Sequence, residues 1–148
     1  ENGNRINFRC VQCRKGRTPM NLEKQVRFLS TTARDIVIPV KSSRIAAGIY
    51  YKNELLGLGV NSYKTHPFQA RYGKHEHAIY LHAEVAAIHN ALKSMDDLSR
   101  KCTLIVVRVT RDGKLALAKP CIGCYRCIVE FNISKVYYST NEHTMMEL

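Results

Sequence analysis

Two short motifs, each at the start of a predicted helix, constrain the fold of this 148-residue chain more than any other feature. The first, His-Ala-Glu at 82–84, opens a predicted helix over 82–94, in which apolar residues recur at helical spacing. The second, Pro-Cys-Ile-Gly-Cys at 120–124, begins with a proline, which suits the first turn of a helix. If the two motifs serve one site, the fold has to bring both helix N-termini to the same place.

The side chains of the two motifs make a set of zinc ligands. Cys121 and Cys124 are three residues apart, so on the first turn of a helix both sulfurs face the same way. Together with the imidazole of His82 they give three protein ligands for a tetrahedral zinc and leave the fourth position to water. Three ligands with an open position are typical of a catalytic zinc, because a structural site uses four. The positive end of each helix dipole also favours ionised thiols.

Glu84 follows the expected ligand histidine by two residues. A carboxylate beside a metal-activated water can take its proton and hand it on, which is general acid and base catalysis. The sequence therefore predicts a nucleophile and a proton shuttle that act on an electrophilic carbon carrying a leaving group. A closed structural zinc site, or a coincidental cluster of the same side chains, is the alternative interpretation.

The remaining segments alternate between helical and strand-like patterns. A helix is expected over 21–34, and a hairpin of two strands over 45–51 and 55–60, followed by a long polar loop over 61–78. Beyond the first motif the sequence predicts strands at 103–109, 114–118 and 135–139, and a helix from Pro120 to about Phe131. This order predicts an α/β protein with the architecture of a three-layer α/β/α sandwich.

The combination of H-x-E with a later P-C-x-x-C is the established signature of zinc-dependent base deaminases. Over about residues 45–140 the chain resembles the cytidine and deoxycytidylate deaminase superfamily, and the stretch 61–67 looks most like its small, phage-type members. The resemblance implies a mixed five-stranded sheet, zinc bound by His82, Cys121 and Cys124, and Glu84 as the proton shuttle. Asn61 matches the family's G-x-N motif, whose asparagine contacts the substrate sugar.

The function that the resemblance implies is hydrolytic deamination of a cytosine nucleotide or nucleoside to the uracil compound and ammonia. The same chemistry on cytosine or adenine in single-stranded DNA or in RNA is the first alternative, because one fold supports both substrate classes. A non-catalytic zinc protein that binds nucleic acid is the second, and Glu84 argues against it. The family usually forms oligomers whose neighbouring subunits complete the pocket, which implies a homo-oligomer.

The charge of the chain is positive and unevenly distributed. The formal net charge is +11, and the first 44 residues hold 10 basic and 3 acidic side chains, against 13 and 9 in the rest. Such an excess favours anionic partners, and nucleic acid, a nucleotide or an acidic protein would all qualify. Of these we expect an anionic nucleotide substrate, with single-stranded nucleic acid as the alternative. We expect a basic arm over 1–20 and a deaminase domain over 21–148.

Six cysteines, four of them in two C-x-x-C pairs, favour metal binding in a reducing compartment over a disulfide framework. We therefore expect a cytoplasmic protein, and no apolar run approaches the ~18 residues of a membrane-spanning helix. Cys10 and Cys13 are candidate ligands of a second, structural zinc, or else free thiols on the arm. Cys102 and Cys127 are expected in the core.

Three further residues are candidate substrate contacts. Lys64 and His66 lie in the loop 61–78, where aromatic and basic residues alternate in a mixture suited to stacking on bases beside phosphate. Tyr125 directly follows the second cysteine of its motif, where it would line the mouth of the site. The plainer interpretation of Lys64 and His66 is that they are surface side chains in water.

Overall fold

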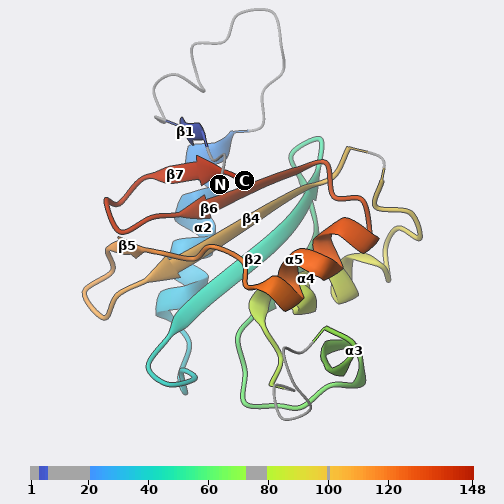
Figure 1. Ribbon diagram of the computed structural model, residues 1–148. Helices are drawn as coiled ribbons and strands as arrows, with labels where there is room; N and C mark the ends of the chain where they lie inside the picture. Colours follow the sequence, from blue (N-terminus) through green and yellow to red (C-terminus); the bar gives the residue numbers. More distant parts are fainter. Residues whose placement is uncertain (1–3, 7–20, 73–79, 100) are drawn as a thin grey trace, which may run out of the picture.

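The computed structural model describes residues 4–6, 21–72, 80–99 and 101–148. Its strands are β1 (Asn4–Ile6), β2 (Arg44–Tyr51), β3 (Glu54–Val60), β4 (Thr103–Val109), β5 (Leu115–Ala116), β6 (Lys135–Ser139) and β7 (Met145–Glu147). Its helices are α2 (Leu22–Arg34), α3 (Pro67–Ala70), α4 (Ala83–Ala91) and α5 (Ile122–Glu130). In the described residues one sheet runs in the order β1-β7-β6-β4-β2-β3, and β5 pairs with β4 (Figure 1). The sheet is mixed, because β4 and β6 are parallel while the other pairs are antiparallel.

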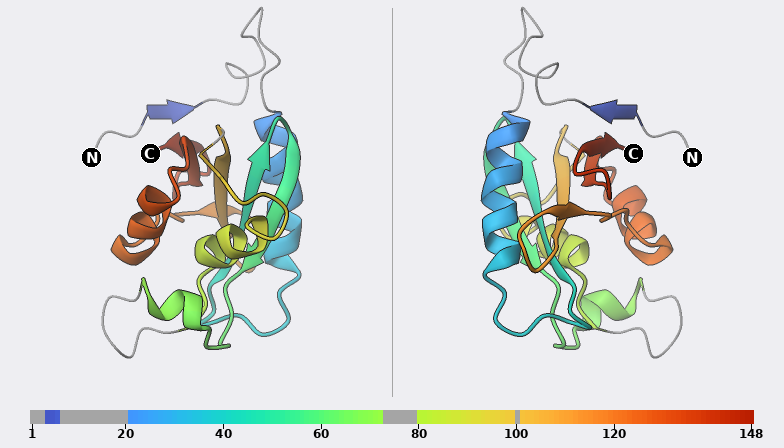
Figure 2. Two further views of the ribbon diagram at one scale, coloured as in Figure 1. Left: turned by 90° about the vertical axis from the view of Figure 1, so that its right-hand side faces the viewer. Right: turned by 90° about the vertical axis from the view of Figure 1, so that its left-hand side faces the viewer.

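The helices form two layers on opposite faces of the sheet, with α2 on one face and α4 and α5 on the other (Figure 2). Helix α2 begins at a cap in which the Asn21 side chain accepts from the Lys24 N–H, 3.1 Å away. Its buried Leu22, Val26 and Leu29 pack against β2 and β4, and α4 and α5 share a second core on the other face. The predicted α/β class, with a mixed sheet covered by helices, is confirmed.

The sheet is larger than the five strands that the family resemblance implied, because the described residues contribute seven. The five expected strands correspond to β2 through β6, and β1 and β7 are additional three-residue strands that pair with each other. Strands this short carry too few residues to show an alternating pattern. Residues 4–6, assigned above to a basic arm, therefore belong to the sheet edge, whereas the boundary predicted at residue 20 lies outside the described residues.

Helix α4 lies unusually close to β3, and this contact positions the motif at its N-terminus. A Cβ atom on Gly59 would lie 2.3 Å from the carbonyl oxygen of Ala83, and one on Gly57 would lie 2.3 Å from that of Ala87. Because both glycines point toward α4 and the helix presents alanines, the two backbones approach closely. Residue 82, the N-cap of α4, is thereby held beside the end of β3.

The predicted loop over 61–78 contains a short helix, α3, that the sequence pattern did not indicate. His66 caps it, with Nδ1 accepting from the Phe68 N–H at 3.1 Å, and Pro67 occupies its first position. None of the helices in the described part of the chain is long and apolar enough to cross a membrane.

Candidate metal centre and active site

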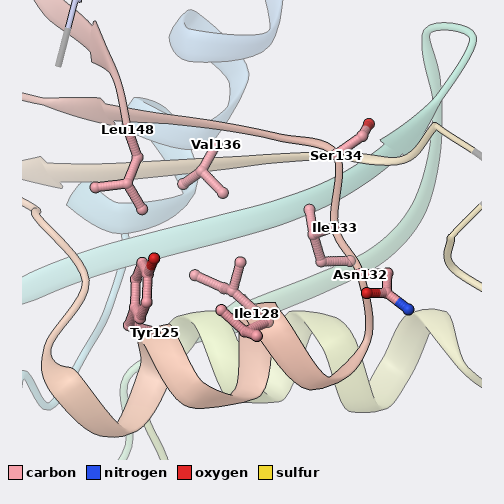
Figure 3. A pocket seen from close by; sticks show the side chains of 8 residues that line it. Tyr125, Ile128, Asn132, Ile133, Ser134, Val136 and Leu148 are labelled. Atoms are coloured by element: carbon pink, nitrogen blue, oxygen red, sulfur yellow. The ribbon is translucent and has the colours of Figure 1, made fainter. Parts of the chain in front are cut away.

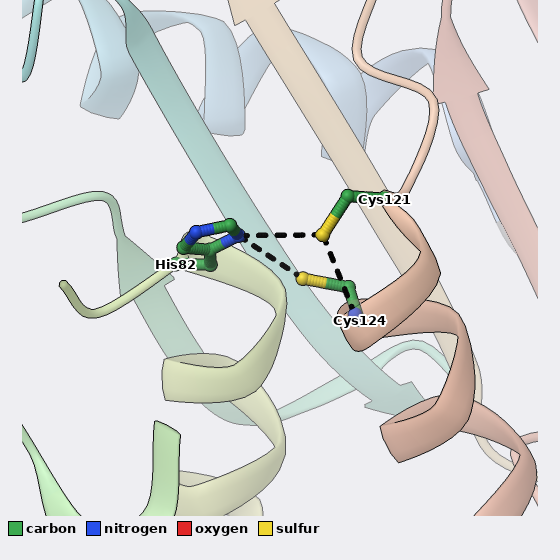
Figure 4. Close-up of side chains that lie close together, drawn as sticks. All are labelled: His82, Cys121 and Cys124. Atoms are coloured by element: carbon green, nitrogen blue, oxygen red, sulfur yellow. Dashed lines mark hydrogen bonds between the residues drawn. The ribbon is translucent and has the colours of Figure 1, made fainter. Parts of the chain in front are cut away.

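The three predicted zinc ligands converge between the N-termini of α4 and α5 (Figure 4). Nδ1 of His82 lies 3.7 Å from Sγ of Cys121 and 3.3 Å from Sγ of Cys124. The three ligand atoms all lie within 4.8 Å of one another. His82 and Cys121 are the N-caps of their helices, and Cys124 is in the first turn of α5, so two separate helix starts supply one cluster.

The geometry of this cluster fits a zinc ion. A tetrahedral zinc with Zn–S bonds of about 2.3 Å and a Zn–N bond of about 2.0 Å places its nitrogen and sulfur ligands about 3.5 Å apart. The two nitrogen–sulfur distances of 3.3 and 3.7 Å lie on either side of that value. Imidazole and thiolate are also the ligands that zinc prefers, and three of them leave a fourth coordination position for water or substrate.

The local backbone explains how each ligand is held. The backbone N–H of Cys124 approaches Sγ of Cys121 at 3.5 Å, so Cys121 caps its helix with its own sulfur. Gly123 lies between them, and a Cβ there would be 1.7 Å from the carbonyl oxygen of Tyr72. The first turn of α5 is therefore packed directly against the backbone of Tyr72, just beyond α3, and no side chain fits at residue 123.

On the histidine side, a buried glutamine holds the backbone. Oε1 of Gln69 accepts from the His82 N–H at 3.0 Å, and Gln69 is only 1% exposed. Its helix is itself tied to α5, because the Tyr72 hydroxyl donates to Glu130 at 2.7 Å and Arg71 contacts the same carboxylate at 3.2 Å. Gln69 thus positions the backbone of His82, the candidate metal ligand.

Gln69→Met is expected to weaken zinc binding by about tenfold, since groups that orient a metal ligand typically contribute 10- to 100-fold to affinity. Methionine keeps the length of the side chain but removes the acceptor and leaves the His82 N–H without it. Zinc affinity measured by chelator competition tests this. Gln25→Met on α2, on the opposite face of the sheet, is the matched control and should leave zinc affinity unchanged. An unchanged affinity in Gln69→Met would show that the hydrogen bond does not orient the ligand.

Electrostatics favour one thiolate in the cluster. The hydrogen bond from the Cys124 side chain, followed by that from His82, lowers the pKa of the Cys121 thiol to about 3. The same pairing and burial raise the pKa of Cys124. These shifts favour the thiolate form of Cys121, which is the form that binds metal.

Glu84 lies in the first turn of α4 and is buried, with only 6% of its surface exposed. Burial raises the pKa of its carboxyl above the ordinary value, and its own backbone N–H and the nearby His82 act in the opposite direction. The carboxyl is therefore more easily protonated than one in water.

Beside this carboxyl is a pocket of about 410 Å³. Glu84, His82 and Asn61 line it together, so the structure brings the predicted shuttle, one candidate ligand and the predicted sugar contact to one cavity. The Asn61 amide also anchors the entry to β2, because its Oδ1 accepts from the Ile45 N–H at 3.1 Å and its Nδ2 donates to the Ser43 carbonyl at 2.9 Å. Two lysines, Lys41 and Lys119, also line this pocket.

The other predicted contacts lie elsewhere among the described residues. Lys64 and His66 are not in the lining of this pocket, and the ring of His66 instead packs edge-on against His89 with centroids 4.6 Å apart. Tyr125 lines a separate pocket of about 390 Å³ between α5 and β6, near Val136 (Figure 3). A substrate role for these three stays a prediction.

The remaining cysteines divide between the core and the undescribed segment. Cys102 and Cys127 are fully buried, as predicted. Cys10 and Cys13 lie outside the described residues, so the second zinc stays a prediction.

Three residues of the site were missed from the sequence. Lys41 and Lys119 were overlooked as pocket residues, and for Lys41 nothing in the local sequence indicates that it lies beside the site. Gln69 gave no signal beyond being a polar residue in a loop next to a proline. The one available signal was the position of Lys119, which directly precedes the second motif.

The fold and the cluster together define a class: an α/β sandwich with a candidate three-ligand zinc site at two helix N-termini. The chain matches the family model described as "Cytidine and deoxycytidylate deaminase zinc-binding region" over residues 20–140. It therefore belongs to the cytidine and deoxycytidylate deaminase family. No curated protein matches the chain.

Similar solved structures carry the same fold. The dCMP deaminase of the cyanophage S-TIM5 is 21% identical, with a TM-score of 0.51 over 78% of this chain and 76% of that one. Its complex with dCMP and dUMP gives 20% identity and a TM-score of 0.50 over 79% and 76% of the two chains. The cytidine deaminase of Mycobacterium leprae is 16% identical, with a TM-score of 0.54 over 85% and 92%.

Proposed function

We propose that this protein is a zinc-dependent hydrolase that deaminates a cytosine nucleotide or nucleoside to the uracil compound and ammonia. The observation that carries the proposal is the buried Glu84 in a pocket that also exposes the ligand His82. A structural zinc site needs no carboxylate there, whereas hydrolysis needs a group that moves protons. The dCMP and dUMP bound to the cyanophage enzyme support the choice of a cytosine compound.

The proposed reaction depends on proton transfer by a side chain of the pocket. A zinc ion held by His82, Cys121 and Cys124 would supply a Lewis acid that makes water nucleophilic at neutral pH. Glu84 accepts a proton from the attacking water and donates it to N3 of the cytosine ring. The same carboxyl then transfers the second proton of that water to the amino nitrogen on C4, which leaves as ammonia. One water is consumed and one ammonia released, so the reaction balances.

Asn61 contributes binding in this proposal. Its side-chain oxygen and its side-chain nitrogen each make one backbone hydrogen bond, which leaves one acceptor lone pair and one N–H for a substrate hydroxyl.

The homo-oligomer and the cytoplasmic location that the sequence implied also stay predictions.

A substrate panel tests the proposed function. Ammonia release is measured for cytidine, deoxycytidine, dCMP, dCTP, a single-stranded DNA oligonucleotide and tRNA, with zinc content determined on the same preparation. We expect turnover of at least one free cytosine compound and no turnover after zinc is removed with a chelator. Turnover of the oligonucleotide or tRNA alone would favour a nucleic-acid deaminase, and binding of nucleic acid with no ammonia released from any substrate would favour a non-catalytic protein.

A further inference from the structure

Two lysines from different parts of the chain line the pocket that contains Glu84. Lys41 lies just before β2, and Lys119 directly precedes the motif that carries the two ligand cysteines. Of the 12 described residues that line this pocket, these two are the basic side chains, apart from the ligand His82, and Glu84 is the acidic one. A neutral substrate such as a nucleoside makes no use of two ammonium groups.

The backbone that carries Lys41 is anchored from several sides. Lys41 and Ser42 both have positive φ, 48° and 65°, and the Ser43 N–H closes the turn on the Val40 carbonyl at 2.7 Å. The Lys41 N–H donates to the hydroxyl of Tyr63 at 2.9 Å, and the Ser43 carbonyl accepts from Asn61. The turn is therefore tied to the end of β3, and it presents Lys41 at a defined place on the pocket rim.

Lys119 is held by the chain on both sides of it. The Ala118 N–H donates to the carbonyl of Ser139 on β6 at 2.9 Å, and Cys121, two residues beyond the lysine, caps α5. Lys119 is half-buried while Lys41 is exposed. Glu84 and Asn61 are buried, so the same pocket is lined by a buried acidic side chain and by two basic side chains that are more exposed.

We propose that Lys41 and Lys119 bind the 5′-phosphate of the substrate, so that the preferred substrate is a cytosine nucleoside monophosphate rather than a nucleoside. This proposal rests on the proposed deaminase function. With the base held beside the buried Glu84, the sugar and the phosphate of a nucleotide would extend toward the more exposed residues of the lining. A phosphate monoester carries close to two negative charges at neutral pH, and lysine binds it as a point charge with three donors.

The test compares dCMP with deoxycytidine as substrates for Lys41→Gln and Lys119→Gln. For dCMP we expect kcat/KM to fall by about tenfold in each variant, mainly through KM, because each loses a charge-assisted contact. For deoxycytidine, which lacks the phosphate, kcat/KM should stay unchanged, and this shows that each variant is folded and loaded with zinc. The matched control is Lys52→Gln, because Lys52 has the same φ of 48° in the turn at the other end of β2 and does not line the pocket.

Three results would overturn the inference. Unchanged dCMP kinetics in both variants would show that neither lysine contacts phosphate. An equal loss for dCMP and deoxycytidine would assign the lysines a structural role. A loss confined to a single-stranded DNA oligonucleotide would assign them to a phosphodiester.

Failure of the proposed function looks different, because then no cytosine compound is turned over by the wild type. Calorimetric binding of dCMP and deoxycytidine then decides the matter for the lysines. Tighter binding of dCMP that is lost in both variants supports the phosphate site. Equal binding of the two compounds rules it out.

Discussion

Glu84→Gln is expected to lower kcat for the cytosine substrate by about 10²–10⁴-fold, the usual contribution of a general acid and base. The same carboxyl is proposed to accept and deliver two protons in turn, so we expect the upper end of this range. Glutamine keeps the size of the side chain and fits the buried position, but it cannot accept and return a proton at neutral pH. The measurement is the steady-state rate of ammonia release at saturating substrate.

Zinc content and the thermal midpoint distinguish loss of chemistry from loss of structure in this variant. Both should match the wild type, because Glu84 is not among the three clustered candidate ligands and glutamine is an uncharged side chain of the same size. The control Glu54→Gln, at the exposed start of β3, should leave kcat unchanged. A Glu84→Gln protein that keeps zinc and turns over within tenfold of the wild type would exclude the proposed proton shuttle.

The candidate metal cluster could be predicted because its two motifs are local sequence patterns. Two cysteines three residues apart on a first helical turn must present their sulfurs together, whatever the rest of the fold does. The apolar stripe of α2 and the β-branched run that became β4 are likewise local patterns, and both elements were found where predicted. What the sequence could not supply was the distance from His82 to the cysteines, which depends on the packing of two helices on one sheet.

The parts that were missed all depend on contacts between distant segments. The pairing of β1 with β7 joins the two ends of the described chain and has no local signature. Gln69 matters only because α3 places its amide beneath the His82 backbone. Lys41 reaches the pocket through a turn whose two central residues have positive φ without being glycine, which sequence statistics disfavour. The residues at the rim of the pocket therefore could not be predicted from the sequence, whereas the three candidate metal ligands could.

The second large effect concerns Gly59, which packs against the first turn of α4, beside residues 82 and 84. Gly59→Ala is expected to lower the free energy of unfolding by about 3 kcal/mol, as overpacking a tight contact does. The added Cβ would lie 2.3 Å from the Ala83 carbonyl oxygen and 2.5 Å from the Ala87 nitrogen. Both are backbone atoms of α4, so no side-chain rotation relieves the clash, and the helix has to move away from β3 by about 1 Å to restore normal contact.

That displacement acts on the site, because residues 82 and 84 are at the N-terminus of the helix that moves. Since a misplacement of about 1 Å costs catalysis about 100-fold, we expect kcat/KM to fall by that order and zinc affinity to fall with it. Denaturant unfolding, chelator competition and ammonia release measure the three quantities. Gly113→Ala is the control: its φ is +84° and a Cβ there meets nothing within 4 Å. It should therefore lose about 1 kcal/mol of stability through backbone strain alone and keep full activity. If Gly59→Ala matched this control in both stability and zinc affinity, the close contact between α4 and β3 would not be what positions the metal ligand.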